Sequence, residues 1–500
     1  MKFKNLSRVE RNMLTGLFCQ FVTILLGFLM PRLYLTYYGS GVNGELNTIK
    51  QLFAYLYLLE AGVGLATIQA LYRPVAMEEH QTVSEILAAT DHYYRRTGTL
   101  YALIVVAIGI VYPMVVHFTL PRGVVLLYTI LYGLPSVTSF FVQAKYRLLM
   151  DVDGRRYVLS NLETATNLIS GIGKVLVLML TQNLLAMQLL YCLCSMLPIP
   201  VILWYTHKNY PWIDHHAKPD YSAVAQKNSV LMHQLSGVIF NNTDMVLLSY
   251  FCNFQLVSVY SIYNMFFVQI IFVMNLFLNS ISFRMGQIFH TDRERFLGLF
   301  DLCETLYLAF VAFCYTMTAA FLLPVIRIYT SGIQDTNYID AFLLLFALKA
   351  VLESGKSIYH QAVQFEGAFQ QTRWHALVEM AINLAITLIG IQFFGIYGCL
   401  FGTLAALLCR TVLIFRYSYR NILHQSMARP ALKWGCYLGL MALILRIVGI
   451  QSRPELSLPG VIGVALLHMI WIGAAFAGAA FLFDHDLLRK LRALRSSIRS

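Results

Sequence analysis

Four ionisable side chains recur at helical spacing inside one apolar stretch, residues 338–363. They follow one another at steps of four, three and four residues and are Lys349, Glu353, Lys356 and His360. These steps place all four on one face of a helix. A charge inside a membrane-spanning helix is costly, so such a face lies against a partner or a water-filled cavity. An amine there could bind an anion, and a carboxylate could take up and release a proton.

Four further apolar stretches carry polar side chains on one face. The sets are Asn47, Lys50 and Gln51 in 44–70; Glu163, Asn167 and Lys174 in 157–180; Gln234, Asn241 and Asp244 in 226–250; and Asn264, Asn275 and Asn279 in 256–280. Lysine presents a point charge to phosphate, whereas amides exchange hydrogen bonds with hydroxyl groups. The combination predicts a cavity for an anionic ligand that is rich in hydroxyls. Asp244 lies deep in its stretch without a basic neighbour on the same helix, which predicts a functional carboxylate.

Structural roles are open alternatives for several of these residues. Lys349 and Glu353 could form an ion pair within their own helix. Lys50 and Lys174 lie near the outer ends of their stretches, so their side chains could extend to the membrane surface instead. Glu163 recurs as Glu379 in a second copy of its segment, and both could pack between helices near the inner ends.

The elements that position these residues are membrane-spanning helices. Apolar and aromatic residues make up 58% of the 500 residues and charged residues 12%, which leaves too little polar surface for a water-soluble protein. This composition excludes a nucleic-acid-binding protein despite a net charge of +12. Runs long enough to cross a membrane fall at 13–37, 44–70, 98–118, 124–149, 157–180, 184–206, 226–250, 256–280, 300–326, 338–363, 374–393, 396–420, 432–450 and 458–483. We therefore predict an all-α integral membrane protein with about fourteen transmembrane helices.

The basic residues predict how these helices are oriented. With a cytoplasmic N-terminus, 29 of the 37 Lys and Arg residues fall on the cytoplasmic side and 5 on the outer side. The other three, Lys50, Lys174 and Lys349, lie within the spans. Because basic loops favour the cytoplasmic side, we expect both termini of this multi-pass protein to be cytoplasmic.

The chain repeats itself at an offset of 216 residues, where segment 163–168 (ETATNL) recurs as 379–384 (EMAINL). The period covers six helices, so both copies point the same way across the membrane, as in transporters whose site lies between two bundles. We predict two pseudo-symmetric six-helix bundles around a central cavity, with two extra C-terminal helices. The predicted parts are an N-lobe at 1–206, a cytoplasmic linker at 207–225, a C-lobe at 226–425, the extra helices at 426–484 and a basic cytoplasmic tail at 485–500.

Several sequence motifs match known sites without the context that those sites need. Residues 39–44 fit GxGxxG, but they follow a predicted spanning helix rather than a strand, and residues 354–357 resemble the end of a phosphate loop inside a span. Asp151 and Asp153 form a lone acidic pair in a short basic loop. The nine cysteines have no CxxC spacing and no histidine partners, which favours small buried residues over disulfides or metal ligands. We predict no enzyme activity, no cofactor and no metal.

The order of several short motifs resembles the bacterial polysaccharide or O-antigen flippases of the multidrug/oligosaccharidyl-lipid/polysaccharide (MOP) superfamily. These motifs are Tyr38-Gly39, Asn43-Gly44, Leu59-Glu60, Leu71-Tyr72-Arg73-Pro74, Asn241-Asn242-Thr243-Asp244, Gly367-Ala368-Phe369 and Gly395-Ile396-Tyr397-Gly398. The resemblance covers most of the chain, from residue 8 to residue 425. It implies a MATE-like fold of fourteen helices in two six-helix lobes around a central cavity. It also implies alternating-access translocation of an undecaprenyl-pyrophosphate-linked oligosaccharide across the bacterial cytoplasmic membrane, for O-antigen, capsule or exopolysaccharide biosynthesis.

The resemblance suggests roles for the polar residues. We expect Lys50, Lys174 and Lys349 to bind the pyrophosphate. The amides expected to bind the sugars are those of Asn241, Asn264, Asn275 and Gln51. No ATP site is found, so we expect Asp244, or second Glu353, to couple transport to a gradient. The expected partners are the lipid-linked oligosaccharide, membrane lipids, a polysaccharide polymerase and glycosyltransferases, and the expected state is a monomer.

Three other functions compete with this interpretation. A lipid II flippase belongs to the same superfamily and also has a basic cavity. A multidrug or cation antiporter would favour acidic and aromatic residues, and three lysines within spans argue against it. A membrane polysaccharide polymerase or ligase would need a sizeable outer domain, and no outer loop is long enough to form one.

Overall fold

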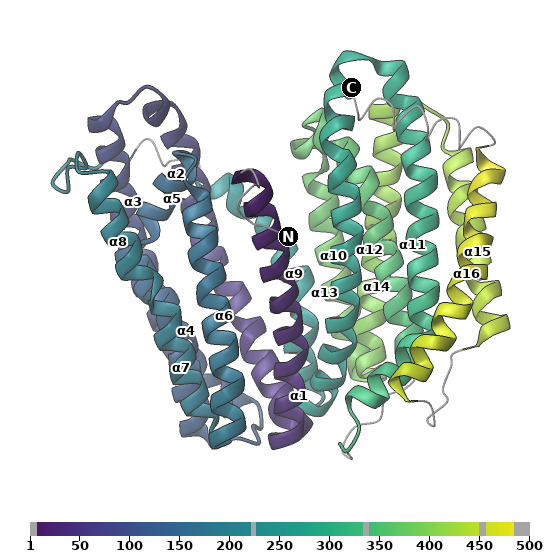
Figure 1. The fold of residues 1–500 in the computed structure, drawn as a ribbon, viewed down its shortest axis with the longest axis horizontal. Coiled ribbons are helices and arrows are strands. Elements are labelled where there is room, and N and C mark those ends of the chain that lie inside the picture. The colour runs from purple at the N-terminus through teal and green to yellow at the C-terminus, as the bar shows by residue number, and fades with distance from the viewer. Residues whose placement is uncertain (1–7, 222–226, 334–339, 450–456, 485–500) are drawn as a thin grey trace. The chain divides into compact units, whose positions relative to one another are not determined.

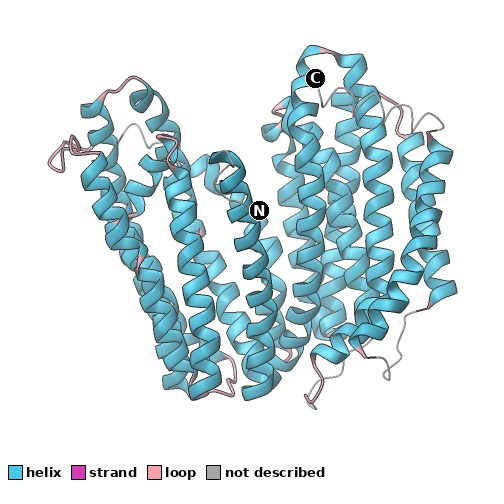
Figure 2. Ribbon diagram, viewed as in Figure 1, coloured by secondary structure: helices cyan, strands magenta, loops and turns pink. Residues whose placement is uncertain are grey.

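A computed structural model describes residues 8–221, 227–333, 340–449 and 457–484. The described ranges are almost entirely helical and contain no strand (Figure 2). The helices labelled in Figure 1 are α1 Arg8–Leu56, α2 Leu58–Ala76, α3 His80–Val115, α4 Arg122–Val142, α5 Ala144–Val152, α6 Arg156–Thr181, α7 Leu184–Met196, α8 Pro198–Asn209, α9 Lys227–Phe251, α10 Phe254–Thr291, α11 Arg293–Tyr329, α12 Asp340–Glu366, α13 Phe369–Phe394, α14 Ile396–Tyr417, α15 Ala428–Val448 and α16 Leu458–Phe483, with a π-helical turn, η3, at Ser418–Leu423. The all-α fold predicted from the apolar runs is confirmed. The predicted basic tail at 485–500 lies outside the described residues.

The chain forms two compact units, Met1–Ser258 and Val259–Ser500. The first unit holds α1 to α9, the second holds α11 to α16, and the boundary falls near the start of α10. Within the first unit α9 packs against α1 and α2. The predicted C-lobe starts at residue 226 and the second compact unit at Val259, so the two boundaries enclose α9 and the start of α10.

Eleven helical segments of the described residues are long and apolar enough to cross a membrane. The first of them, Phe21–Glu60, contains a kink at Gly39 and therefore includes two of the predicted spans. Two further helices, α9 and α12, have 25 and 27 residues, which is also enough to span, but their polar faces lower their mean hydropathy. With these additions the helices correspond to the fourteen predicted spans.

The predicted boundary between the first two spans is confirmed. The prediction separates 13–37 from 44–70, and α1 consists of two helices that meet at Gly39, inside the predicted gap. The second predicted span is interrupted between Leu56, where α1 ends, and Leu58, where α2 begins. At the kink Gly39 has a φ of 80°, which glycine adopts without the steric cost that a β-carbon adds. A β-carbon on Gly44 would lie 1.9 Å from the carbonyl oxygen of Phe254, so this position also requires glycine. The glycines of the GxGxxG string thus serve the kink and the close packing of helices.

Large apolar side chains cover the outer surfaces of both units. Leu180 in the first unit is 82% exposed, and Phe393 and Ile470 in the second are 76% and 73% exposed. Exposure of such side chains is unfavourable in water and is favourable only against another apolar phase. Together with the spanning helices, this surface makes the chain a multi-pass membrane protein.

The two C-terminal helices of the second unit, α15 and α16, pack on α11. Lys433 of α15 has no exposed surface, and its Nζ lies 2.8 Å from Glu304 Oε2 and 2.6 Å from Asp301 Oδ1, both on α11. The hydroxyl of Tyr419 donates a hydrogen bond of 2.8 Å to Glu304 Oε1. Lys433 is thus a buried anchor that holds α15 on α11.

Candidate functional site

Two cavities of the first unit share the polar face of α6. One has a volume of 640 Å³ and the other a volume of 380 Å³. Glu163 of α6 lines the larger cavity, whereas Asn167 and Lys174 of the same helix line the smaller one. We call the smaller one the amine cavity, after Lys50 and Lys174, and the larger one the carboxylate cavity, after Glu60 and Glu163.

Two of the three lysines predicted to bind pyrophosphate lie together in the amine cavity. Lys50 projects from α1 and Lys174 from α6. The amine of Lys174 lies 4.6 Å from the centroid of the Tyr191 ring, which is a cation–π contact. Helices far apart in the sequence thus bring two positive charges to one cavity. This arrangement favours a binding role over side chains that merely extend to the membrane surface.

A buried amide of the amine cavity has an unused hydrogen-bond donor. Gln188 is 2% exposed and lines this cavity, and its Nε2 has no hydrogen-bond partner within the described part of the chain. Leaving a buried donor unsatisfied costs about 1–3 kcal/mol. The neighbouring amides are engaged: Asn43 donates to Ser258 Oγ at 2.8 Å, and Asn47 donates to the carbonyl oxygen of Asn43 at 2.8 Å. An oxygen of a bound ligand would satisfy Gln188.

Four tyrosines also line the amine cavity: Tyr34, Tyr128, Tyr132 and Tyr191. Three of them form a stacked series, with ring centroids 6.3 Å apart between Tyr128 and Tyr132 and 6.0 Å apart between Tyr132 and Tyr191. Aromatic faces of this kind pack against the apolar faces of sugar rings while the hydroxyls remain available for hydrogen bonds. The sequence analysis missed these tyrosines, because in a membrane protein each one counts as an ordinary apolar residue.

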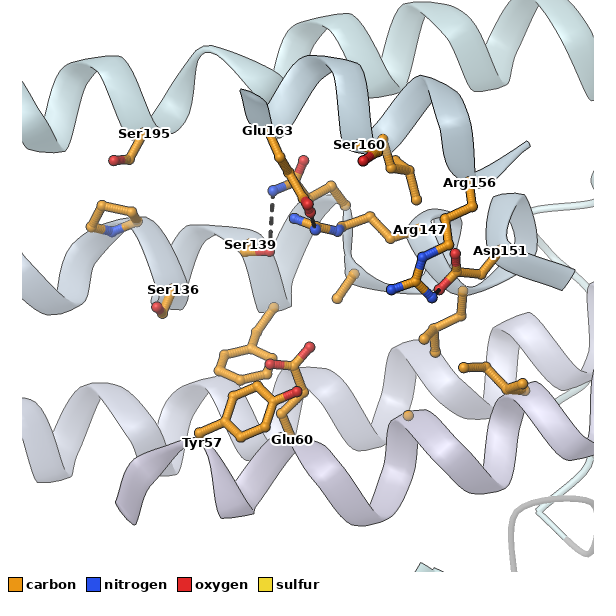
Figure 3. A pocket seen from close by; sticks show the side chains of 18 residues that line it. Tyr57, Glu60, Ser136, Ser139, Arg147, Asp151, Arg156, Ser160, Glu163 and Ser195 are labelled. Atoms are coloured by element: carbon orange, nitrogen blue, oxygen red, sulfur yellow. Dashed lines mark hydrogen bonds and ion pairs between the residues drawn. The ribbon is translucent and has the colours of Figure 1, made fainter. Parts of the chain in front are cut away.

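The carboxylate cavity is lined by both signs of charge (Figure 3). Arg147 of α5 forms an ion pair with Glu163 of α6, and Arg156 lies 3.3 Å from Asp151. Glu60 of α2 faces this group from the opposite side of the cavity (Figure 3). Glu163 joins α6 to α5 through its ion pair with Arg147, and its side chain is 48% exposed at the cavity wall, so a packing role and a binding role both stay open.

The third predicted lysine, Lys349, belongs to the second unit. Its Nζ donates a hydrogen bond of 3.0 Å to the hydroxyl of Tyr260 and lies 5.7 Å from the centroid of the Phe346 ring. Glu353, the second predicted coupling residue, lies 3.4 Å from Lys356. The alternative of an ion pair between Lys349 and Glu353 is therefore wrong, since each has another partner.

Lys356 also connects to the second copy of the repeated segment. Its Nζ lies 3.0 Å from Glu379 Oε1, and Arg410 Nε lies 3.9 Å from Glu379 Oε2. Glu379 is 8% exposed and Asn383 is 1% exposed, with the amide of Asn383 donating to Thr403 Oγ1 at 3.2 Å. Glu379 therefore has the packing role that the sequence analysis considered for it.

Asp244, the first predicted coupling residue, is 4% exposed on α9 in the first unit. Its neighbour Thr243 shares a hydrogen bond of 2.7 Å with the hydroxyl of Tyr55 on α1, and Gln51 of α1 donates to the sulfur of Met245 at 3.5 Å. Asp244 and Gln51 thus lie along the contact between α1 and α9. Their roles in coupling and sugar binding stay predictions.

The other predicted sugar-binding amides lie on α9 and α10. Asn241 is exposed and donates to the carbonyl oxygen of Gly237 in its own helix at 2.8 Å. Asn264 is half-buried and Asn275 is exposed. The side chain of Gln234 lies outside the described ones. None of the three described amides lines the amine or the carboxylate cavity.

Solved structures with a similar fold are membrane transporters. The lipid II flippase MurJ in an inward closed conformation aligns with a TM-score of 0.70 and 14% identity, over 95% of this chain and 99% of that chain. An inward-facing multidrug resistance MATE family transporter of the MOP superfamily aligns with a TM-score of 0.61 and 12% identity, over 81% and 96%. The MATE multidrug transporter DinF-BH aligns with a TM-score of 0.56 and 14% identity, over 85% and 98%. No protein-family profile and no curated protein sequence matches the chain.

The chain has the fold of the MOP-superfamily transporters and flippases. The solved structures that share this fold include a lipid II flippase and multidrug transporters. They share one fold across lipid II flipping and multidrug transport, so the substrate of this chain has to be argued from its own cavities.

Proposed function

We propose that the protein is a flippase for undecaprenyl-pyrophosphate-linked oligosaccharides, which it moves from the cytoplasmic to the outer leaflet of the bacterial cytoplasmic membrane by alternating access. The observation that carries this proposal is the amine cavity. Two lysines, a buried amide with a free donor and a wall of tyrosines share one cavity inside a transporter fold. Surface polysaccharide assembly is the process that such a flippase serves.

The charges of the amine cavity match those of the proposed substrate. A pyrophosphate that links a lipid to a sugar carries two negative charges, and Lys50 and Lys174 supply two positive charges. An unpaired ion inside a membrane protein costs far more free energy than a paired one. Because the charges of the two lysines and the pyrophosphate cancel, binding of the pyrophosphate in this cavity is favoured. The amide of Gln188 can donate to a phosphate or sugar oxygen, and the tyrosines can pack on the first sugar rings. Lys349 belongs to the second unit, and its predicted part in pyrophosphate binding stays a prediction.

Lipid II is the second candidate substrate, because the flippase MurJ shares the fold over nearly the whole chain. It presents the same pyrophosphate to the amine cavity and differs in the attached groups. A multidrug antiporter is less consistent with the cavity, since a cationic drug would meet two amines there. We place the protein in the membrane as a monomer with both termini cytoplasmic, next to the glycosyltransferases that make its substrate and the polymerase that uses it.

Flipping by the purified protein in liposomes tests this function directly. A fluorescent lipid-linked oligosaccharide is incorporated, and the outer-leaflet fraction is followed with an impermeant quencher. We expect Lys50→Gln and Lys174→Gln each to reduce the rate about 10- to 100-fold, because each removes a charged hydrogen bond worth about 1.5–3 kcal/mol.

Lys208→Gln is the matched control, since Lys208 is an exposed lysine at the end of α8 in the same unit and lies against Trp204. It should flip at the unchanged rate. Normal flipping by the Lys50→Gln, Lys174→Gln and double variants would contradict the proposed site. Transport of lipid II in preference to the oligosaccharide would replace the substrate and keep the site.

A further inference from the structure

The carboxylate cavity is a second polar cavity that the binding of pyrophosphate does not use. Its volume of 640 Å³ lies within the range of about 300–1,000 Å³ that is typical of sites for small molecules. It is enclosed by side chains of α2, α4, α5, α6 and α7, all in the first unit (Figure 3). Carboxylates line this cavity, whereas the charged residues that line the amine cavity are two lysines.

The charged groups of this cavity leave one carboxylate outside the salt bridges. Arg147 pairs with Glu163, and Arg156 pairs with Asp151. Glu60 forms no salt bridge with any residue in the described part of the chain, and Figure 3 shows it facing Arg147 and Glu163. Three carboxylates against two guanidiniums give the lining an excess of negative charge. A phosphate group is therefore disfavoured here, whereas a neutral or positively charged group is accepted.

The uncharged groups of this cavity point to a ligand that donates hydrogen bonds. Gln143 is 3% exposed and lines the cavity, and its Nε2 donates to Ser139 Oγ at 3.1 Å. Its Oε1 has no hydrogen-bond partner in the ranges that the structure describes, so a buried acceptor is unused. Ser136, Ser160 and Ser195 add hydroxyl groups to the lining. Carboxylate and amide oxygens next to serine hydroxyls are groups that can bind the hydroxyls of a sugar.

We propose that the carboxylate cavity is the binding site for the sugars of the substrate, separate from the amine cavity that binds the pyrophosphate. This proposal rests on the flippase function proposed above. Sugar hydroxyls donate to Glu60 and to Gln143 Oε1 at the cavity wall. The occupant is a neutral or amino sugar, because the excess of negative charge rejects an acidic one.

The shared helix α6 connects the two sites. Ser160 lines the carboxylate cavity and Asn167 lines the amine cavity, and both are exposed. Seven residues of α-helix correspond to a rise of about 10 Å. The two sites are therefore close enough for a sugar and its pyrophosphate to occupy them within one molecule. On the predicted topology the carboxylate cavity lies nearer the cytoplasmic side, where the substrate arrives.

Cysteines placed in each cavity report their occupants separately. Ser160→Cys and Asn167→Cys are made in the full chain, and the rate of maleimide labelling at each position is measured by peptide mass spectrometry. The probes are maltotriose, chitotriose and inorganic pyrophosphate, with glycerol at equal osmolality as the control. We expect the sugars to slow labelling at position 160 and not at 167, and pyrophosphate to slow labelling at 167 and not at 160.

Glu60→Gln tests the residue that carries the proposal. It should raise the half-saturating sugar concentration at position 160 about 10- to 100-fold, because a charged acceptor is lost. Pyrophosphate protection at position 167 should stay unchanged, which shows that the variant is folded. Glu79→Gln, at an exposed carboxylate outside both cavities, should behave as the parent protein.

The two proposals fail in different ways. If neither sugar protects position 160, or both positions are protected equally, the sugar site is refuted even when pyrophosphate still protects position 167. Full sugar protection in Glu60→Gln would likewise overturn it. If pyrophosphate fails to protect position 167, the proposed pyrophosphate site is refuted, whatever the sugars do at position 160.

Discussion

Loss of the buried lysine of α15 should destabilise the protein strongly. Lys433 and Glu304 both have no exposed side-chain surface, and their charged atoms lie 2.8 Å apart. Lys433→Met keeps the aliphatic stem and removes the charge, which leaves Glu304 buried without its cation. Breaking a buried ion pair by removing one partner typically costs about 3–5 kcal/mol. Tyr419 still donates to Glu304 Oε1 at 2.8 Å, so we expect the lower end, about 3 kcal/mol.

The reciprocal substitution should cost less. In Glu304→Gln the amine of Lys433 keeps Asp301 Oδ1 at 2.6 Å, so its charge stays paired. The double variant Lys433→Met with Glu304→Gln removes both charges, so no unpaired carboxylate is left buried at position 304. It should therefore be more stable than Lys433→Met alone, because the effects of substitutions in one ion-pair network on the free energy of unfolding are not additive. Because Asp301 still pairs with Lys433 in Glu304→Gln, we expect Glu304→Gln to lose less stability than Lys433→Met.

Heating in detergent followed by size-exclusion chromatography measures the folded fraction of each variant. The lowest midpoint temperature should belong to Lys433→Met, and the exposed control Lys208→Met should match the parent protein. The reasoning is refuted if Lys433→Met has the same midpoint temperature as the control Lys208→Met, or if the double variant has a lower midpoint temperature than Lys433→Met.

Three further predictions concern the first unit. Gln188→Leu should leave thermal stability unchanged or raised, because a buried unsatisfied donor is removed, while pyrophosphate binding in the labelling assay weakens. Gly44→Ala should lower the melting midpoint by the equivalent of about 1–3 kcal/mol, whereas Gly27→Ala, with nothing within 4 Å of its β-carbon, should not. Reporter fusions at Asn183 should read outside and those at Ala217 inside; the reverse result would contradict the orientation inferred from the basic residues.

The sequence could predict the spanning helices and four polar residues of the amine cavity, Asn47, Lys50, Asn167 and Lys174. Lys50 and Lys174 can be recognised in the sequence because a charge in an apolar span is costly and usually faces a cavity or a partner. The structure places both side chains at the amine cavity. The tyrosines of the same cavity could not be predicted in this way. Their hydroxyls are compatible with a core, a cavity or the membrane interface, and only the packing of α1, α4 and α7 brings them together.

Ion pairs along α12 show a second limit of sequence reasoning. Lys349 and Lys356 lie four and three residues from Glu353, and both spacings allow a pair on a helix. Residues of neighbouring helices determine which partner each lysine has. Tyr260 of α10 accepts a hydrogen bond from Lys349, and Glu379 of α13 lies 3.0 Å from Lys356. Since neither partner is local in the sequence, spacing alone could not decide.

The repeated segment shows how the two units use one pattern differently. Glu163 and Asn167 in the first unit are exposed on the walls of the two cavities, where they can exchange partners with a ligand. Their counterparts Glu379 and Asn383 are buried, and their side chains bond to neighbouring helices of the second unit. A carboxylate held by Lys356 and Arg410 would have to break buried ion pairs to bind a substrate, which is costly. The same residue types at the same spacing therefore favour binding in the first unit and rigid packing in the second.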